Sequence, residues 1–418
     1  MGLQISECST VGEYKTRSNS ETGGDYIYVN KFNHSLVFSD NGTKALMSEP
    51  IIQEDNITWY VDYNSNETAS ARVGSNDHPF ASLDELFLFL PKNTNGHRIK
   101  VYVKADQVNK SVTFDGFENL DIYANDSSAS ASCIFAITNC KNIKIYGSDV
   151  ATLASVYDKV GAITNSSVEL VMDSEATNDG FFKVDGPIVN SSVSSTVPVA
   201  ISITAVEGIS YFDIKKHSNV SFNSVEAEAL KNIRVDDSEF TAASVISADL
   251  TARNTGIIKI DTMYTSKASS HEVSISADSL SNIAINAYAK DQSENSDYRD
   301  FLVIAASNNS RISVISNVDN ETSELIPVKS ITANTGSYIS VATLTGYLTN
   351  AGEEAEDVFH QPALESHMTS TIMYVGNNLG ANTLAPTEVK DTMGQINVAE
   401  GSAADLTNYV SYNASTAV

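Results

Sequence analysis

The sequence, 418 residues long, contains little cysteine. Its three cysteines, Cys8, Cys133 and Cys140, are an odd number without the spacing of a disulfide framework or a zinc site. This excludes a disulfide-stapled secreted module, and a reducing folding compartment fits the chain best. Cys133 and Cys140 lie on a strand-like run, so we interpret both as small buried apolar residues rather than reactive thiols.

Basic residues are also scarce. The chain has 26 lysines and arginines against 52 acidic residues, which gives a formal net charge of −26. Such a surface repels phosphate at long range, so we expect no nucleic-acid partner, and a sugar, a protein or a cationic surface fits better. Because an exposed structural protein also needs a charged surface for solubility, the acidity alone identifies no ligand.

Long apolar runs are missing. No run reaches the roughly 18 residues that a membrane-spanning helix requires, and residues 1–6 lack the charged and apolar regions of a signal peptide. We therefore expect neither membrane insertion nor export by that route.

Signatures of catalysis are missing too. The sequence has no Gly-rich phosphate loop, no Gly-x-Ser-x-Gly elbow and no Cys/His constellation. His360 and His367 flank Glu365 without a recognised zinc spacing. Acidic residues gather in three places: Glu226 with Glu228, Asp236 and Asp237 with Glu239, and Glu353, Glu354, Glu356 with Asp357.

These acidic clusters have two interpretations. A glycosidase needs two carboxylates at a defined separation, which spacing in the sequence does not give. Acidic residues at turns are more often solvated. We name no catalytic, cofactor-binding or metal-binding residue and expect no cofactor; the sequence favours a protein that is not an enzyme and leaves a hidden carboxylate pair open.

What the sequence does contain is a recurring four-residue phrase, polar, apolar, polar, apolar. Clear copies are Asn142-Ile143-Lys144-Ile145, Asn232-Ile233-Arg234-Val235 and Asn282-Ile283-Ala284-Ile285. Each phrase predicts a short β-strand with one buried face. Many short strands between polar turns, with almost no helix, predict a β-solenoid whose inner faces are stacks of Ile, Val, Phe and Ala.

The spacing of similar phrases gives the expected size of one coil. Residues 245–250 and 273–278 repeat a local pattern less than 30 residues apart, which suggests about 25 residues per coil. Asparagine precedes many of the strands because it tolerates a left-handed backbone and its amide can bond the same residue in the next coil. We interpret these asparagines as structural.

One helix is legible, over residues 80–91. Ser82 is the expected N-cap, Glu85 completes a capping box, and Pro91 ends the segment. The apolar stripe of this helix suits the open apolar end of a stack of strands, so we expect it to cover that end.

The chain divides into four expected regions. Residues 1–57 predict a β-rich attachment region, 58–115 the solenoid entrance with its capping helix, 116–345 the parallel β-helix, and 346–418 a C-terminal cap, tip or trimerisation region.

The entrance resembles that of bacteriophage tail-spike and tail-fibre parallel β-helices. The resemblance covers residues 58–125 and consists of a strand, a loop, a helix and a second strand in order: Tyr60-Val61-Asp62, Asn76-Asp77-His78-Pro79-Phe80, Ser82-Leu83-Asp84-Glu85-Leu86, Leu90-Pro91-Lys92, Asn95-Gly96-His97 and Ile99-Lys100-Val101-Tyr102-Val103. It implies an all-β fold, a single-stranded right-handed parallel β-helix with a short N-terminal capping helix and small β-rich end regions.

The resemblance also implies a function. It suggests a structural virion protein made in the host cytoplasm, a fibre or tail-spike subunit in a homotrimer. Its N-terminal region would attach to other virion proteins, and its rod or tip would contact a glycan or protein of the host surface. A polysaccharide depolymerase spike, acting as glycosidase or lyase, and a bacterial surface adhesin are the alternatives. Trp59 and the 18 tyrosines are available to stack on sugars, but none is named as a binding residue.

Overall fold

The computed structural model describes short parts of the first fifty residues and most of the strands that follow. The described residues are 5–8, 26–30, 35–40, 43–46, 57–92, 94, 96–104, 110–124, 133–147, 158–172, 182–184, 186–201, 211–227, 232–246, 248–264, 272–289, 301–316, 328–342, 347–349, 358–360, 363–376, 388–392, 394–400 and 409–413. The chain divides into two compact units, Met1–Asp185 with Ser191–Pro198, and Gly186–Asn190 with Val199–Val418.

The first unit holds the strands up to β13, most of β15 and one short helix. Its elements are β1 (Ile5–Cys8), β2 (Tyr26–Asn30), β3 (Ser35–Asp40), β4 (Thr43–Leu46), β5 (Thr58–Asp62), α2 (Leu83–Phe87), β6 (Ile99–Lys104), β7 (Lys110–Asp115), β8 (Leu120–Ala124), β9 (Cys133–Thr138), β10 (Ile143–Gly147), β11 (Asp158–Thr164), β12 (Ser167–Met172), β13 (Phe182–Val184) and β15 (Ser192–Ile201). Strands β1 to β4 form a separate sheet in which β1 and β2 are parallel and β2, β3 and β4 are antiparallel.

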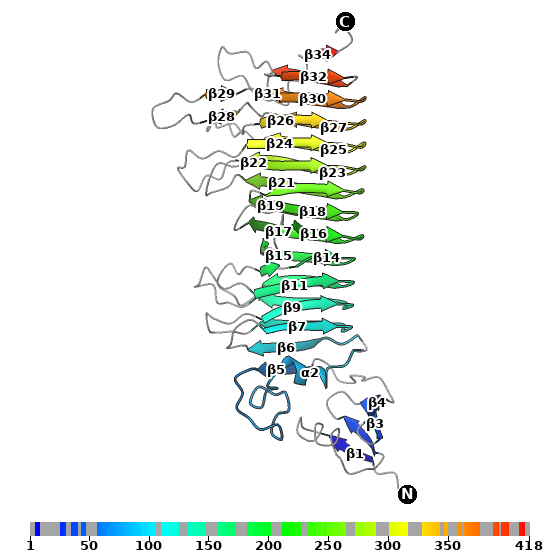
Figure 1. Cartoon of the computed structure of the whole chain (residues 1–418). Coiled ribbons are helices and arrows are strands. Elements are labelled where there is room, and N and C mark those ends of the chain that lie inside the picture. Colours follow the sequence, from blue (N-terminus) through cyan, green and yellow to red (C-terminus); the bar gives the residue numbers. More distant parts are fainter. Residues whose placement is uncertain are drawn as a thin grey trace. The chain divides into compact units, whose positions relative to one another are not determined.

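From β5 onward the first unit is built of parallel pairs. Strand β5 pairs with β6, and then β6, β8, β10, β12 and β15 follow one another in one parallel sheet. Strands β7, β9, β11 and β13 follow one another in a second parallel sheet. The chain therefore alternates between two stacks of strands, and each coil adds one strand to each stack (Figure 1).

The second unit repeats this plan. Its strands are β14 (Ile188–Val189), β16 (Tyr211–Lys215), β17 (Asn219–Ala227), β18 (Asn232–Asp236), β19 (Glu239–Ile246), β20 (Asp249–Arg253), β21 (Ile257–Tyr264), β22 (Glu272–Ala277), β23 (Asn282–Ala289), β24 (Phe301–Ala306), β25 (Arg311–Ser316), β26 (Val328–Ala333), β27 (Tyr338–Ala342), β28 (Tyr347–Thr349), β29 (Val358–His360), β30 (Ala363–His367), β31 (Thr371–Gly376), β32 (Glu388–Thr392), β33 (Gln395–Glu400) and β34 (Tyr409–Asn413).

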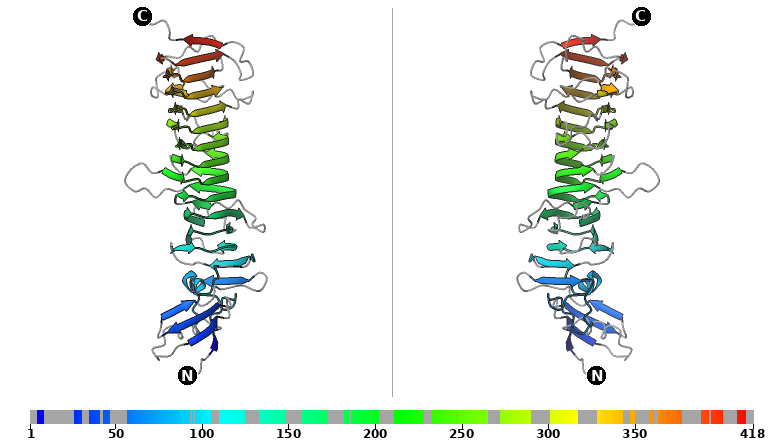
Figure 2. Two further views of the ribbon diagram at one scale, coloured as in Figure 1. Left: turned by 90° about the vertical axis from the view of Figure 1, so that its right-hand side faces the viewer. Right: turned by 90° about the vertical axis from the view of Figure 1, so that its left-hand side faces the viewer.

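Two parallel stacks run through the second unit as well. One contains β14, β16, β18, β20, β22, β24, β26, β30 and β32, and the other contains β17, β19, β21, β23, β25, β27, β31 and β33. Seen from two sides, the strands lie above one another as successive rungs (Figure 2). Strands β28 and β29 form an antiparallel pair, and β34 adds to β33 in the antiparallel sense.

The expected fold class is confirmed at this level: the protein is all-β, with long parallel sheets consistent with a parallel β-solenoid. In the large sheet, parallel pairing begins at β5 and β6 and continues past residue 345, where β26 pairs with β30 and β27 with β31. The division of the chain into four functional regions stays a prediction.

The core of each coil is a stack of identical or similar apolar residues. In the second unit six isoleucines lie in register on successive strands, each fully buried: Ile258, Ile283, Ile312, Ile339, Ile372 and Ile396. The facing stack has a row of small residues, Ala252, Ala277, Ala306 and Ala333, followed by Ser366. Both rows are buried, so both contribute to the core of the second unit.

The turns between the two stacks repeat one design. Residues with positive φ occur at each of these corners, and asparagine is the commonest, as at Asn139, Asn165 and Asn254. The amide of Asn165 donates to Asn139 one coil away at 3.1 Å, and that of Asn142 donates to Asn119 at 2.6 Å. The structural interpretation is therefore confirmed for the corner asparagines, whereas Asn232 and Asn282 are the first residues of β18 and β23 and do not have positive φ.

The last residue of each corner is small and buried. This corner row contains Cys140, Ser166, Ser191, Ser218, Ser238, Gly256, Ser281, Ser310, Ser337 and Ser370. The backbone N–H of Ser281 donates to the hydroxyl of Ser310 at 3.1 Å, and that of Ser310 donates to Ser337 at 3.2 Å. The hydroxyls of this row thus accept hydrogen bonds from backbone N–H groups of the neighbouring coil, which would otherwise be buried without partners.

The spacing of the corner row along the sequence gives the number of residues in each coil. Linked corner serines are 20 residues apart at Ser218 and Ser238, and 33 apart at Ser337 and Ser370. Coil length varies because the number of residues between successive strands differs from coil to coil, so the expected 25 residues is only a mid-range value. The two phrases at 245–250 and 273–278 are not equivalent either, because the first spans the end of β19 and the start of β20, whereas the second lies along β22.

Helix α2 is shorter than expected, with five residues instead of the span 80–91. Ser82 is the N-cap and accepts the N–H of Glu85 at 3.2 Å, as expected, and the Glu85 carboxylate accepts the N–H of Ala81 at 3.0 Å. The helix ends at Phe87, before Pro91. The ring of Phe87 lies 5.1 Å from that of Phe114 at the end of β7.

Candidate functional site

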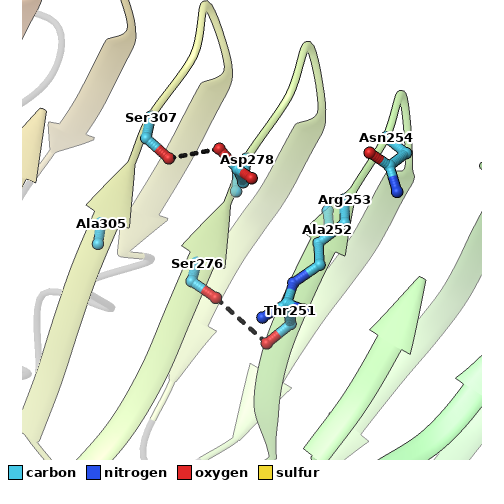
Figure 3. Close-up of a pocket in the computed structure, with 9 residues that line it drawn as sticks. Thr251, Ala252, Arg253, Asn254, Ser276, Asp278, Ala305 and Ser307 are labelled. Atoms are coloured by element: carbon cyan, nitrogen blue, oxygen red, sulfur yellow. Dashed lines mark hydrogen bonds between the residues drawn. The ribbon is translucent and has the colours of Figure 1, made fainter. Parts of the chain in front are cut away.

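A shallow cavity of about 440 Å³ lies on the outer face of β20, β22 and β24 in the second unit. Thr251 and Arg253 come from β20, Ser276 from β22 and Ala305 from β24, while Asp278 and Ser307 follow the ends of their strands (Figure 3). The volume is within the roughly 300–1,000 Å³ of small-molecule sites.

The hollow results from a row of small outward side chains. Thr251, Ser276 and Ala305 lie in register on three successive parallel strands, and each is only partly exposed. Because neighbouring parallel strands are about 4.8 Å apart, three small side chains in line leave a continuous shelf. Ser276 donates to the hydroxyl of Thr251 at 3.1 Å, which leaves the Thr251 proton available to a ligand (Figure 3).

Asp278 forms the acidic wall of the cavity. One of its carboxylate oxygens accepts from Ser307 and from Asn308, both at 2.6 Å, and the other accepts from Ser279 at 3.0 Å. These bonds, that of Ser307 foremost, hold the pKa of Asp278 below its usual value. The lowered pKa means that this carboxylate stabilises the fold at neutral pH, and the contribution is lost only as the pH falls through that lowered pKa.

Arg253 is the basic group of the cavity. Its side chain is exposed, and its guanidinium makes no ion pair or hydrogen bond with any residue that the structure describes. Three other basic residues of the second unit are paired: Arg234 binds Asp213 at 2.7 Å, Lys259 binds Glu239 at 2.7 Å, and Lys329 binds Glu272 at 2.9 Å. Arg253 is therefore available to a ligand, and the sequence alone did not single it out.

A second surface feature is a ladder of stacked tyrosines in the first unit. Tyr60, Tyr102, Tyr123 and Tyr146 lie in register with ring centroids 5.1, 4.5 and 4.2 Å apart. Burial, with Tyr146 next to it, raises the pKa of Tyr123 above the usual value for tyrosine. Because the ring faces cover one another, the inner rings present edges and hydroxyls to solvent rather than faces for sugars.

In the one acidic cluster that the structure describes, each carboxylate has a partner outside the cluster. Glu239 is bonded to Lys259, Asp236 accepts from Asn254 at 2.8 Å, and Asp237 lies 3.2 Å from His217. The side chains of Glu226 and Glu228 and the whole cluster at 353–357 lie outside the described residues.

Among the residues that the structure describes, the histidines and cysteines form no metal-binding group. His367 lies 3.6 Å from Glu365 on β30, whereas His360 is on β29. Across the described part of the chain, no group of three or more His, Cys, Asp or Glu side chains is placed to hold a metal ion. Cys140 is buried, which raises the pKa of its thiol, so the apolar interpretation is confirmed for it; the side chain of Cys133 lies outside the described residues.

The described residues also hold no helix that is long and apolar enough to cross a membrane.

The entrance contains a buried ion pair that the sequence did not reveal. Arg72 binds both carboxylate oxygens of Glu85, at 2.7 and 2.9 Å, and also donates to the carbonyl of Glu67. This ties the polar loop before α2 to the helix. Trp59 is buried with its ring edge against Phe80, so it is not exposed for stacking on a sugar.

Comparisons with protein-family models, with curated proteins and with solved structures gave no match.

Proposed function

We propose that this chain is a structural and attachment subunit of a bacteriophage particle, of the fibre or tail-spike type, which assembles as a homotrimer and contacts the host cell surface. The observation that carries the proposal is the parallel register, which sets the same outward positions on successive coils. Such a surface is rigid and polar and suits repeated weak contacts, which symmetric assembly multiplies.

Three further points support this proposal. The order of strand, loop, helix and strand at 58–125 resembles the entrance of such spikes. The aromatic contact of α2 with Phe114 fits a helix that closes one end of a right-handed parallel β-helix. The carboxylates of Asp213, Glu239 and Glu272 are engaged in ion pairs, which favours attachment over acid–base hydrolysis.

In this proposal residues 1–57 attach to other virion proteins and residues 346–418 form a cap, tip or trimer clasp. The protein is made in the host cytoplasm and ends in the virion. Its partner on the host is a surface glycan or protein, and it has no nucleic-acid partner.

The assembly is tested by the mass in solution. The purified full chain, measured by multi-angle light scattering, is expected to have about three times the mass of the 44.9 kDa chain. The same sample, fluorescently labelled, is expected to adsorb to the surface of a susceptible bacterium within a panel of strains. A particle of single-chain mass at micromolar concentration would contradict the trimer, and a trimer that adsorbs to no strain would contradict the attachment role.

A further inference from the structure

We propose that the cavity on β20, β22 and β24 binds a sugar acid, a polyhydroxylated ring that carries one carboxylate, with Arg253 as the residue that holds the carboxylate. This inference rests on the proposed attachment function and names the chemistry of the surface that would be recognised.

Arg253 carries a positive charge that is left without an ion pair. The chain has 52 acidic and 26 basic residues, and Asp236 is the in-register neighbour of Arg253 on β18, yet the guanidinium forms no ion pair with any residue that the structure describes. A guanidinium offers parallel N–H donors that match the two oxygens of a carboxylate. A carboxylate on a ligand thus supplies the pairing that the protein itself does not.

The floor of the cavity is lined by small polar side chains. Thr251 and Ser276 present hydroxyl groups 3.1 Å apart, and Ala305 has only a methyl group, so a ring can approach the strands closely. The Thr251 hydroxyl is free to donate and the Ser276 oxygen is free to accept. A sugar ring carries several hydroxyls that both donate and accept, and it can therefore satisfy both groups at once.

Asp278, which follows β22, the strand next to β20, forms the acidic wall of the cavity. Asp278 is ionised and stays so because Ser307 and Asn308 bond to it. A second negative charge near it would be repelled, but ligand hydroxyls can donate to its remaining lone pairs. The cavity therefore has one basic end and one acidic wall, which fits a ligand with a single carboxylate and several hydroxyls better than a phosphate or a diacid.

The test uses the full chain and calorimetric titration with methyl glucuronide, methyl glucoside and inorganic phosphate. Methyl glucuronide is expected to bind about tenfold or more tightly than methyl glucoside, because a hydrogen bond to a charged group is worth more than a neutral one. Arg253→Gln is expected to remove this difference, and Thr251→Val, which keeps the shape and removes the hydroxyl, to weaken glucuronide binding several-fold.

The matched control is Arg311→Gln, an exposed arginine of the same unit whose guanidinium lies over the ring of Tyr338, outside the cavity. It is expected to bind glucuronide as the wild type does. Circular dichroism confirms that each variant is folded. A glucuronate oligosaccharide with higher affinity than the methyl glycoside would indicate that the ligand is a residue within a polysaccharide, and equal affinity that it is a single sugar acid; either result supports the site.

Three results would overturn the proposal: equal binding of glucuronide and glucoside, glucuronide binding unchanged in Arg253→Gln, or phosphate bound as tightly as glucuronide with the same dependence on Arg253. Light scattering of the same samples separates this proposal from the proposed function. A trimer that adsorbs to cells but ignores glucuronide overturns the sugar-acid site alone. Glucuronide binding by a monomer leaves the site standing and contradicts the assembly.

Discussion

Replacing Ile312 with alanine is expected to lower the free energy of unfolding by about 2–5 kcal/mol. Ile312 is fully buried and lies in register between Ile283 and Ile339, in the middle of the isoleucine row. Alanine leaves a cavity that the neighbouring coils are poorly able to fill, because their strands are held at a fixed spacing by the parallel hydrogen bonds on both sides.

The measurement is urea unfolding followed by circular dichroism. Ile312→Val, which removes one methylene group, is the graded control and is expected to cost about 0.5–1.5 kcal/mol. Ser313→Ala changes the next residue on the same strand, which faces outward, and is expected to stay within about 0.5 kcal/mol of the wild type. Because coils of a solenoid contact mainly their neighbours, amide exchange should increase first in β23, β25 and β27. A valine variant less stable than the alanine variant would contradict the cavity argument.

The strand phrases predicted the fold well because each records a local property. Alternation of polar and apolar residues sets which face of a strand is buried, and the corner asparagines record a backbone conformation that few other residues tolerate. Both patterns can be recognised within four or five consecutive residues, without knowledge of contacts between coils. The phrase at Asn282 accordingly predicted β23, with Ile283 and Ile285 buried.

What the sequence could not supply was the register between coils. Residues 245–250 and 273–278 look alike, but the first runs from the end of β19 to the start of β20 and the second lies along β22. The number of residues between successive strands differs from coil to coil, so equivalent residues do not recur at a fixed interval. A repeat search that assumes one period therefore aligns the wrong residues.

The candidate site was hidden for the same reason. Thr251, Ser276 and Ala305 meet only because three strands from three coils align, and no local motif joins them. Arg253 looks in the sequence like any solvated arginine, and only the described contacts show that its guanidinium has no acidic partner among the described residues. A detectable signal would have been the small outward residue at the same place in successive strands, but this requires the register first.

Replacing Gly256 with serine, the residue that most other coils have at this position, is expected to lower the free energy of unfolding. Gly256 belongs to the buried corner row, since its carbonyl accepts from Asn282 just as that of Ser281 accepts from Arg311. A consensus of the row would place serine there. A Cβ atom on Gly256, however, would lie 2.4 Å from the carbonyl oxygen of Val235 and 2.9 Å from that of Arg253.

Both clashing atoms belong to the backbone, so no side-chain rotation relieves them. The coil before this corner is short, because Asn254 bonds to Asp236 only 18 residues earlier. The turn at Gly256 therefore lies close to the backbone of the preceding coil at Val235. Any side chain must push β18 and β20 apart and weaken the parallel bonds between them. Gly256→Ser and Gly256→Ala are both expected to cost about 3 kcal/mol, at the upper end for overpacking, since the added hydroxyl cannot offset a clash made by Cβ.

Ser281→Ala is the matched control in the next coil, where a Cβ is already accommodated. It removes one hydrogen bond, from the serine hydroxyl to the carbonyl of Asp278 at 2.6 Å, and is expected to cost about 1 kcal/mol. Urea midpoints of the three variants decide the matter. If Gly256→Ala unfolds at the wild-type midpoint, the corner accommodates a Cβ atom without loss of stability. The close approach of the two backbones then does not require glycine at this position, and the prediction is wrong.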